Sequence, residues 1–355
     1  MIRELWRYRK LTTRTYPIAG ASVGSGPTPV PIEITQYAQE DVFDRLIVEV
    51  RGNVTVVGAG PGVATGAPNP HGLLNRALLQ TQPQYNGVVP INNVSARTLL
   101  TDALMARGYL LSATEAPIPD VAGVYAVDFF LEMWFKRPRM RKGIQSAFYL
   151  QKYTSALLTL NFGGREQLFQ GGVNTWDLSG LQIFLWADSD LAVQSDEIHA
   201  VELFEQTYPV PAAQTDFPID TLPPGYLYTH FYFQTEVNGA LANTVLNNID
   251  IEGGGRVWLP QGDNNAAFLQ HEVTAGMLLN DTTQDPTGLY VVPLRDGMYT
   301  RAIDALTAPI TIKLDVNAPG ATRLVRLGCR RMIPGAIQQR KQNAPAVQRK
   351  NVAGH

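Results

Sequence analysis

Apolar and polar residues alternate along several stretches of the chain, most clearly over residues 310–316. The apolar positions there are Ile310, Ile312, Leu314 and Val316. This period of two predicts a strand with one buried and one solvated face. Residues 317–320 (NAPG) predict a turn, because Pro fixes φ and Gly accepts a positive φ, and residues 324–327 then predict the returning strand of a hairpin. The same pattern over residues 154–169, with Gly163-Gly164 as its turn, predicts a second hairpin.

The order of predicted elements repeats along the chain. In the first half we expect strands at residues 42–57, 73–80, 124–135 and 181–186, with a helix that begins after Ser95. In the second half we expect strands at 198–210, 226–237 and 245–252, with a helix over 265–277. The offsets between paired elements are about 170 residues, and about 154 for the two hairpins. Nearly constant offsets are typical of a duplication whose loops have drifted in length.

Many strands, Pro/Gly-rich loops and one helix in each half predict an all-β chain. The expected architecture is two tandem eight-stranded antiparallel jelly-roll sandwiches, with short helices in the connecting loops. A parallel α/β fold would need a helix between successive strands. The expected division is a basic arm and linker, a first jelly roll, a second jelly roll and a basic tail, at residues 1–31, 32–190, 191–335 and 336–355.

Charge is sorted between the ends and the body of the chain. The 355 residues carry a net charge of −2, yet residues 1–14 and 330–355 together hold eleven Lys and Arg and one acid, which leaves −12 on the body. Residues 1–14 fit a short helix with a basic face opposite an apolar face that contains Trp6. Basic ends on an acidic body predict that the ends meet an anionic partner; solubilising tails are the alternative.

The reactive motifs in the sequence favour structural interpretations. Residues 54–62 (VTVVGAGPG) begin like a dinucleotide fingerprint, but Val63 and two prolines stand where its helix should start. No two of the five histidines have metal-site spacing, and Cys329 alone forms no disulfide framework. We therefore expect no cofactor, no metal and no catalytic residue.

Two further patterns leave a functional alternative open. Asp128 and Glu132, and Asp250 and Glu252, each share a face of a strand, as paired carboxylates of a glycosidase would. Strand alternation also puts acids on the solvated face of ordinary sheets, which is the favoured interpretation. The basic residues between Lys136 and Lys142 fit an exposed loop, and no apolar run reaches the length of a membrane-spanning helix. We expect a soluble chain.

The chain resembles the double jelly-roll major capsid proteins of tailless icosahedral phages, many of which enclose a membrane. The resemblance covers residues 30–335 and rests on architecture and on strand segments such as DRLIVEVRGNVTV, SALLTLNF and ITIKLDVNAPGATRLVRLG. It implies a homotrimer that forms a pseudo-hexagonal capsomer and tiles a virion shell, with other capsid proteins at the vertices. It also implies synthesis in the host cytoplasm, no enzymatic activity and no small-molecule substrate.

In that family the termini face the interior membrane or the genome. The resemblance and the charge pattern together predict that these residues make such contacts: Arg3, Trp6, Arg7, Lys10, Arg14, Arg340, Lys341, Arg349 and Lys350. Two other classes of protein stay open. One is a carbohydrate-active or amidase-type double jelly-roll enzyme or lectin, and the other is a minor or vertex capsid component.

Overall fold

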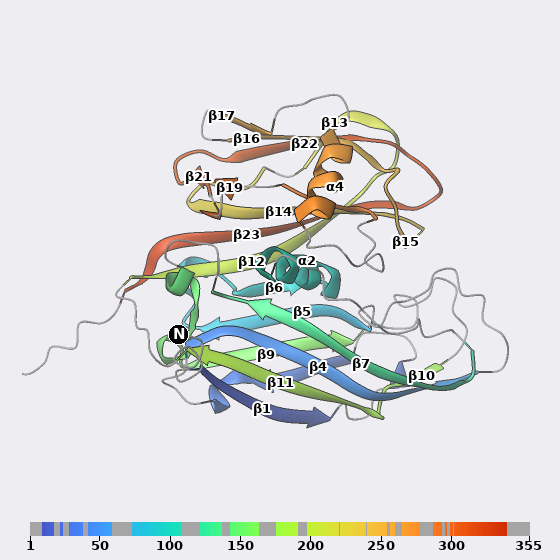
Figure 1. The fold of residues 1–355 in the computed structure, drawn as a ribbon, viewed down its shortest axis with the longest axis vertical. Helices are drawn as coiled ribbons and strands as arrows, with labels where there is room; N and C mark the ends of the chain where they lie inside the picture. The colour runs from blue at the N-terminus through green and yellow to red at the C-terminus, as the bar shows by residue number, and fades with distance from the viewer. Residues whose placement is uncertain are drawn as a thin grey trace, which may run out of the picture.

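The structure is a computed structural model that describes most of the chain. The described ranges are 9–17, 22–23, 28–37, 42–58, 73–107, 121–136, 143–162, 175–190, 197–219, 221–238, 240–253, 256–259, 265–276, 287–292, 295–296, 299–300 and 302–338. Strands dominate these ranges, and the two sandwiches that they form lie one above the other in Figure 1. Among the described residues, no helix has both the length and the apolar character needed to cross a membrane.

The first sandwich, coloured blue to green in Figure 1, has two sheets. One sheet has the order β1, β11, β4, β7, with bounds Arg9–Pro17, Leu181–Asp190, Val42–Val57 and Gly123–Trp134. Short strands β2, β8 and β10 extend it, at Ser22–Val23, Phe148–Tyr149 and Thr175–Asp177. The facing strands have the order β3, β9, β5, β6, with bounds Thr28–Glu33, Ser155–Phe162, Leu74–Gln82 and Ile91–Val94.

The second sandwich, coloured yellow to red, is built in the same way. One sheet has the order β12, β23, β14, with bounds Glu197–Pro209, Arg323–Gln338 and Tyr226–Val237. The outer edge of β14 pairs with three short strands, β15 (Ala240–Leu241), β18 (Leu289–Val291) and β21 (Ile303–Ala305). The facing sheet has the order β13, β22, β16, β17, with bounds Gln214–Pro218, Ile310–Val316, Leu246–Gly253 and Arg256–Leu259.

Helices and short ribbons occupy the connections. The two α-helices are α2 (Ala96–Arg107) and α4 (Asn265–Gly276). Short 3-10 helices η2, η4, η5 and η6 lie at Ile34–Gln36, Tyr85–Gly87, Gly143–Ser146 and Leu150–Lys152. The ribbon of β19 and β20 lies at Arg295–Asp296 and Tyr299–Thr300.

The pairing scheme of the first half recurs in the second. The order β1-β11-β4-β7 corresponds to β12-β23-β14 followed by β18 and β21, and the order β3-β9-β5-β6 corresponds to β13-β22-β16-β17. Helix α2 follows β6 as α4 follows β17. The two halves join where β6 pairs in parallel with β12, through Ile91 with Leu203 and Asn92 with Phe204. The predicted double jelly roll is therefore confirmed, and β1 fills in the first half the place of β12 in the second.

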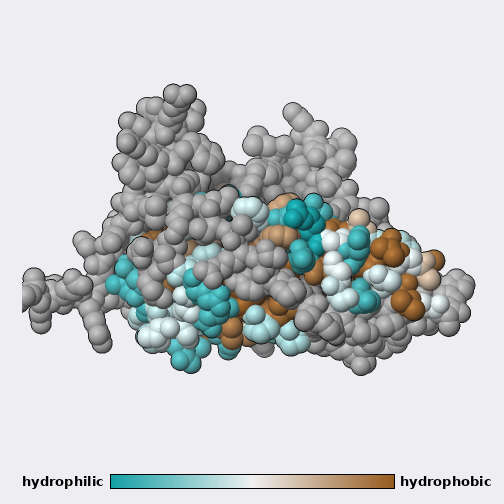
Figure 2. Space-filling view, turned by 90° about the horizontal axis from the view of Figure 1, so that it is seen from below, coloured by the Kyte–Doolittle hydropathy of each residue, from teal (hydrophilic) through white to brown (hydrophobic). Residues whose placement is uncertain are grey.

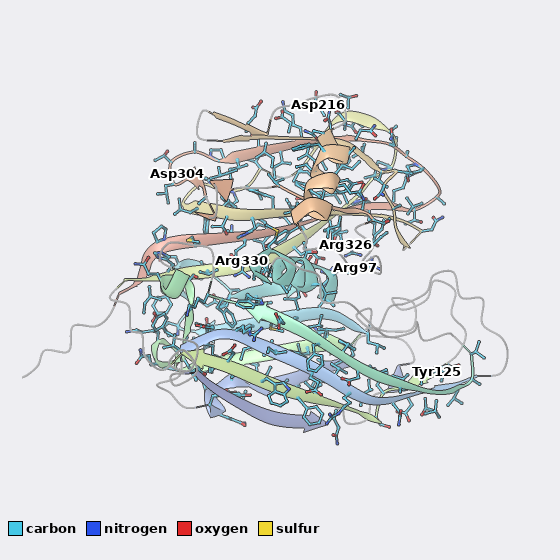
Figure 3. All side chains as sticks on the ribbon, viewed as in Figure 1. Arg97, Tyr125, Asp216, Asp304, Arg326 and Arg330 are labelled. Atoms are coloured by element: carbon cyan, nitrogen blue, oxygen red, sulfur yellow. The ribbon has the colours of Figure 1, made fainter. Side chains whose placement is uncertain are left out.

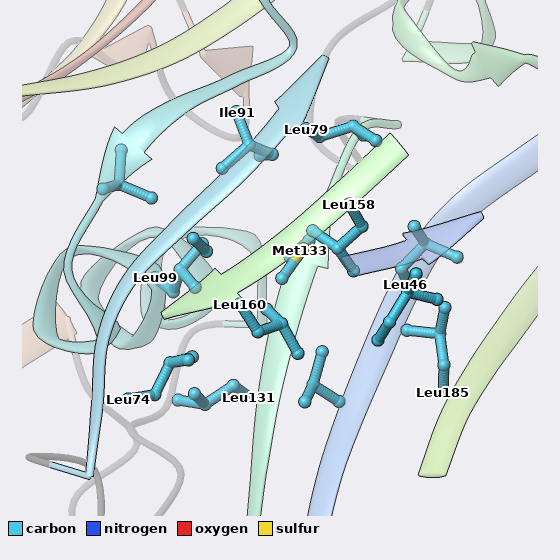
Figure 4. Close-up of a cluster of buried hydrophobic side chains, with 14 of the residues drawn as sticks. Leu46, Leu74, Leu79, Ile91, Leu99, Leu131, Met133, Leu158, Leu160 and Leu185 are labelled. Atoms are coloured by element: carbon cyan, nitrogen blue, oxygen red, sulfur yellow. The ribbon is translucent and has the colours of Figure 1, made fainter. Parts of the chain in front are cut away.

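Alternating strand positions build two cores. In β9 the buried positions are Ala156, Leu158, Leu160 and Phe162, and in β22 they are Ile310, Ile312, Leu314 and Val316, all predicted from the sequence. The first core also takes leucines from α2 and β5, as Figure 4 shows for Leu99 and Leu74. The second core contains Cys329, which is fully buried.

Both predicted hairpins differ from the structure. β22 pairs with β13 and β16, whereas β23 pairs with β12 and β14 in the other sheet, so residues 317–320 connect two sheets. β9 pairs along both edges, with β3 and β5, and residues 163–174 lie outside the described ranges. Alternation shows that a segment is a strand with one buried face, but it does not identify the strand's partner.

The ends of the fold extend beyond the predicted limits. The helix predicted over residues 1–14 is wrong for its described part, because Arg9–Pro17 form β1 and pair with β11 along nine residues. At the other end β23 continues past Pro334-Gly335 to Gln338. A bulge opposite His199 accommodates these residues, and the Gly335 N–H donates to His199 Nδ1 at 3.1 Å. The boundary between residues 190 and 191 stays a proposal.

Candidate functional site

Helix α2 lies between the two sandwiches (Figures 1 and 3). Ser95 is its N-cap, because the Ser95 Oγ accepts a hydrogen bond from the Thr98 N–H at 3.2 Å. Ala96 and Leu99 are buried in the first core. Thr98, on another side of the helix, approaches Gly328 of β23, where an added Cβ would lie 2.9 Å from the Thr98 methyl group. A helix of the first sandwich thus covers the outward side of a sheet of the second.

We call this covered surface the second outer face. It comprises the outward positions of β12, β23 and β14, namely Leu203, Glu205, Arg326, Gly328, Arg330, Tyr232, Gln234 and Glu236. Leu203 and Tyr232 pack with the first core although they belong to the second half. The second outer face is therefore an interior surface of the whole molecule.

Asp102 of α2 and Arg330 of β23 form an ion pair on this face. Both side chains are fully buried. Arg330 donates from Nε to Asp102 Oδ1 at 3.1 Å and from Nη2 to Oδ2 at 2.5 Å, and the Tyr232 hydroxyl donates to Oδ1 at 2.6 Å. This paired geometry compensates two charges that would otherwise be costly to bury.

Glu205 of β12 forms hydrogen bonds and ion pairs with residues of both halves. The Ser95 N–H and the Thr98 hydroxyl donate to its Oε2 at 2.9 and 2.7 Å, and its Oε1 forms ion pairs with Arg76 and Arg326. Burial raises the pKa of the Glu205 carboxyl, but Arg76, the hydrogen bonds from Ser95 and Thr98, and Arg326 outweigh it and hold the pKa below its usual value. Glu205 is therefore ionised and bound to both sandwiches at neutral pH.

Further polar contacts extend the interface on either side. Arg97 of α2 and Arg326 of β23 both form ion pairs with Glu236. The Gln234 amide donates to Thr101 Oγ1 at 3.0 Å. At the junction of β6 and β12, Glu202 accepts from Asn92 at 2.7 Å and pairs with Arg331. These contacts fix the relative orientation of the two sandwiches. Each one either joins the two halves or holds in place a side chain that joins them.

The corresponding surface of the first sandwich carries aromatic and charged residues. We call it the first outer face. It comprises the outward positions of β4, β11 and β7, namely Arg45, Ile47, Glu49, Arg51, Phe184, Trp186, Asp188, Phe130, Glu132 and Trp134. Arg45 pairs with Glu132 at 2.8 Å and with Asp188 at 2.9 Å. The indole N–H of Trp186 donates to Glu49 at 2.8 Å and that of Trp134 donates to Glu132 at 2.8 Å, so both indole rings are held in place by buried carboxylates.

The other sequence candidates lie apart from these faces. After Gly58 the described chain resumes at Leu73 and enters β5, and residues 59–72 lie outside the described ranges. His199 accepts a hydrogen bond from the Gly335 N–H of β23, and His230 contacts the hydroxyl of the neighbouring Thr229. His71 and His355 lie outside the described ranges. The described residues contain no group of three His, Cys, Asp or Glu that could hold a metal ion.

The two carboxylate pairs have dissimilar surroundings. Asp128 is exposed, whereas Glu132 is buried against Arg45 and Trp134. Asp250 lies on the outward side of β16 opposite Lys313. Burial and the nearby charge of Glu252 raise its pKa, against the opposing charge of Lys313. Of the basic segment at residues 136–142, Lys136 pairs with Asp44 at 3.1 Å, and the rest lies outside the described ranges.

The basic residues predicted to face an anionic partner are only partly described. Lys10 and Arg14 lie in β1, opposite Ser189 and Leu185 of β11. The others lie outside the described ranges: Arg3, Trp6, Arg7, Arg340, Lys341, Arg349 and Lys350. Their contact with a membrane or genome stays a prediction.

Sequence reasoning missed the charged interface between the sandwiches. Asp102 and Arg330 are 228 positions apart, and neither belongs to a short motif. One local signal was present, since Arg326, Arg330 and Arg331 interrupt an otherwise apolar stretch over residues 324–333. Arginines within a buried strand indicate carboxylate partners, although the sequence does not say which ones.

Comparisons with known proteins find the fold and no sequence relative. No family model matches the chain, and no curated protein matches it. A chain of the atomic structure of Sulfolobus Turreted Icosahedral Virus is similar to it with a TM-score of 0.65 and 16% identity, over 92% of this chain and 91% of that one.

Two further structures agree. The major capsid protein P2 from bacteriophage PM2 matches with a TM-score of 0.53 and 10% identity, over 94% of this chain and 99% of that one. The quasi-atomic model of the PBCV-1 virus capsid matches with a TM-score of 0.52 and 13% identity, over 93% and 96%. The chain therefore has the double jelly-roll fold of viral major capsid proteins, as the sequence resemblance implied.

Proposed function

We propose that the chain is a major capsid protein of a virion. In this proposal it is synthesised in the host cytoplasm, its copies form trimers shaped as pseudo-hexagonal capsomers, and the capsomers tile an icosahedral shell with other capsid proteins at the vertices. Its role is structural rather than enzymatic.

One observation carries the proposal. The structural match to viral capsid proteins extends over nearly the whole of both chains, so it includes two sandwiches in the same relative arrangement. The interface between the sandwiches explains why this arrangement is fixed, since ion pairs join α2 to β23 and β14 and join β5 to β12. A rigid pair of similar sandwiches supplies two lateral walls per chain, as a shell subunit requires.

The native mass tests the proposed self-association. Sedimentation of the purified chain at micromolar concentration should give about three times the chain mass of 39.0 kDa. A particle of one chain at every concentration tested would contradict the proposal. A stable species with another number of chains would instead favour a minor or vertex component.

We further propose that the basic termini face an interior membrane or genome. Neutralising Arg3, Arg7, Lys10 and Arg14 to Gln should weaken sedimentation of the protein with anionic vesicles or its retention of DNA, because each lost charge removes an attraction to phosphate. A matched variant with four Lys or Arg residues from the body of the chain changed to Gln has the same net charge and controls for it. Unchanged binding in the neutralised variant would refute this placement.

A further inference from the structure

Within one chain the contact between the sandwiches has two parts. An edge strand of the first half, β6, pairs in parallel with the edge strand β12 of the second half. Helix α2, which follows β6, covers the second outer face through Arg97, Thr98 and Asp102. The chain thus shows how one sandwich of this kind packs against the next.

The second sandwich has a strand and a helix equivalent to β6 and α2. No described segment of this chain packs on them in the way that the second sandwich packs on β6 and α2. Its strand β17 occupies the place of β6, and among the described residues it pairs with β16 alone. Its helix α4 buries Ala266 and Leu269 with the same spacing as Ala96 and Leu99 in α2. By that spacing, Phe268 lies at the helical position of Thr98.

Of these two residues, the polar Thr98 is buried and the apolar Phe268 is exposed. Thr98 is 1% exposed because it packs on the second outer face, whereas Phe268 is 56% exposed. A phenylalanine exposed to this extent, at the position that makes the contact in α2, indicates a surface that becomes covered.

The first sandwich offers the matching surface. The first outer face is equivalent by strand order to the second outer face, and its Phe184, Trp186 and Ile47 are half-buried while Phe130 is 45% exposed. Strand β1 is equivalent to β12, and among the described residues its only partner is β11. Figure 2, which views the molecule from the first-sandwich side, shows hydrophobic residues exposed between hydrophilic ones.

We propose that α4 of one copy covers the first outer face of a second copy, with β17 beside β1, so that the contact between copies repeats the contact within a chain. The inference rests on the proposed capsid function and names its lateral surface. The contact joins two different surfaces, so each copy can bind one neighbour through α4 and another through its first outer face. Contacts of this head-to-tail kind form a closed ring when the rotation between copies allows it. A ring of three chains then alternates internal and intermolecular contacts around six similar sandwiches.

Substitution of Phe268 tests the donor side. Phe268→Glu places a charge on a residue that is exposed in the single chain, so folding should be retained. The concentration at half-assembly, measured by sedimentation or mass photometry, should rise at least tenfold. Leu306→Glu is the matched control, since Leu306 is also an exposed hydrophobic residue, at 45%, but follows β21; its assembly should equal that of the unsubstituted protein.

Cross-linking tests the pairing of surfaces. The double variant Ala267→Cys and Arg51→Cys puts an exposed thiol on α4 and another on the first outer face, and these elements belong to the upper and the lower sandwich of Figure 1. The natural Cys329 is fully buried and does not compete. A flexible bis-maleimide should produce covalent dimers and trimers. The double variant Ala267→Cys and Leu306→Cys should remain at one chain.

The outcomes separate the surface from the function. If the unsubstituted protein forms trimers but Phe268→Glu assembles normally and the first double variant does not cross-link between chains, the assigned surface is wrong and the capsid proposal stands. If the unsubstituted protein never associates, the proposed function fails first. Weakened assembly of Phe268→Glu, together with cross-linked trimers of the first double variant, supports both the assigned surface and the capsid function.

Discussion

At the scale of single residues, the buried pair Asp102–Arg330 is the contact whose loss should cost most. Asp102→Asn keeps the size of the side chain but leaves the Arg330 charge without compensation at a site with no exposure. Removing one partner of a buried pair typically costs about 3–5 kcal/mol. We expect urea unfolding of Asp102→Asn to show a loss in this range.

Two further variants serve as controls for the loss of stability expected of Asp102→Asn. The double variant Asp102→Leu and Arg330→Met should lose less than Asp102→Asn, because no charge then remains buried. Arg51→Met, which breaks a pair whose arginine is 55% exposed, should change the unfolding free energy by less than about 1 kcal/mol. If Asp102→Asn and Arg51→Met cost the same, the ion pair does not hold the sandwiches together.

Residue patterns predict burial better than they predict partners. The inward positions of β9 and β22 follow from alternation alone, since a period of two assigns each side chain to a face. The partners of Asp102 and Glu205 do not follow from any local pattern, because they come from segments more than 100 positions away. The charged interface was therefore outside the reach of sequence reasoning, whereas the cores were within it.

At the scale of elements, the close approach of β4 to the turn before β11 depends on Gly52. Gly52 has a φ of +139°, and a Cβ there would lie 2.1 Å from the Gly180 carbonyl oxygen. Gly225 also has a positive φ, +97°, but has open space where its Cβ would lie. We expect Gly225→Ala to cost about 1–3 kcal/mol from backbone strain. Gly52→Ala should lose a further amount of about 1–3 kcal/mol from steric overlap.

The measurement is urea unfolding of both alanine variants beside the unsubstituted chain. Equal losses would show that the backbone at Gly52 moves away from Gly180 without cost. A larger loss for Gly52→Ala would show that the backbone of β4 cannot move away from Gly180 at this point without cost.

Element boundaries were predicted more accurately than connections. The strands at 42–57 and 226–237 and the helix after Ser95 agree with β4, β14 and α2. The hairpin predicted at 308–327 was wrong because the successive strands β22 and β23 lie in opposite sheets of the second sandwich. The helix predicted near the N-terminus was wrong at Arg9–Arg14 because pairing with β11 outweighs a weak amphipathic pattern.

At the scale of the whole molecule, two apolar cores meet at a charged interface, and acid should weaken the interface before the cores. The pKa of the Glu205 carboxyl is held below its usual value of 4.5 in the folded protein. A carboxyl with a lowered pKa stabilises the fold fully above its usual value, and this contribution is lost as the pH falls through the lowered pKa. The apolar contacts within each core carry no such dependence.

Calorimetry across this range tests the expectation. The unsubstituted chain should unfold in one transition at pH 7, and below about pH 4.5 the transition should broaden or divide as protonated Glu205 releases Arg76 and Arg326. In Glu205→Gln the divided transition should already be present at pH 7. The difference in unfolding temperature between this variant and the unsubstituted protein should therefore become smaller as the pH falls. A difference that stays constant from pH 7 to pH 3 would mean that Glu205 does not couple the sandwiches. In the proposed capsomer, the rigidity of the two sandwiches would then have to come from contacts between copies.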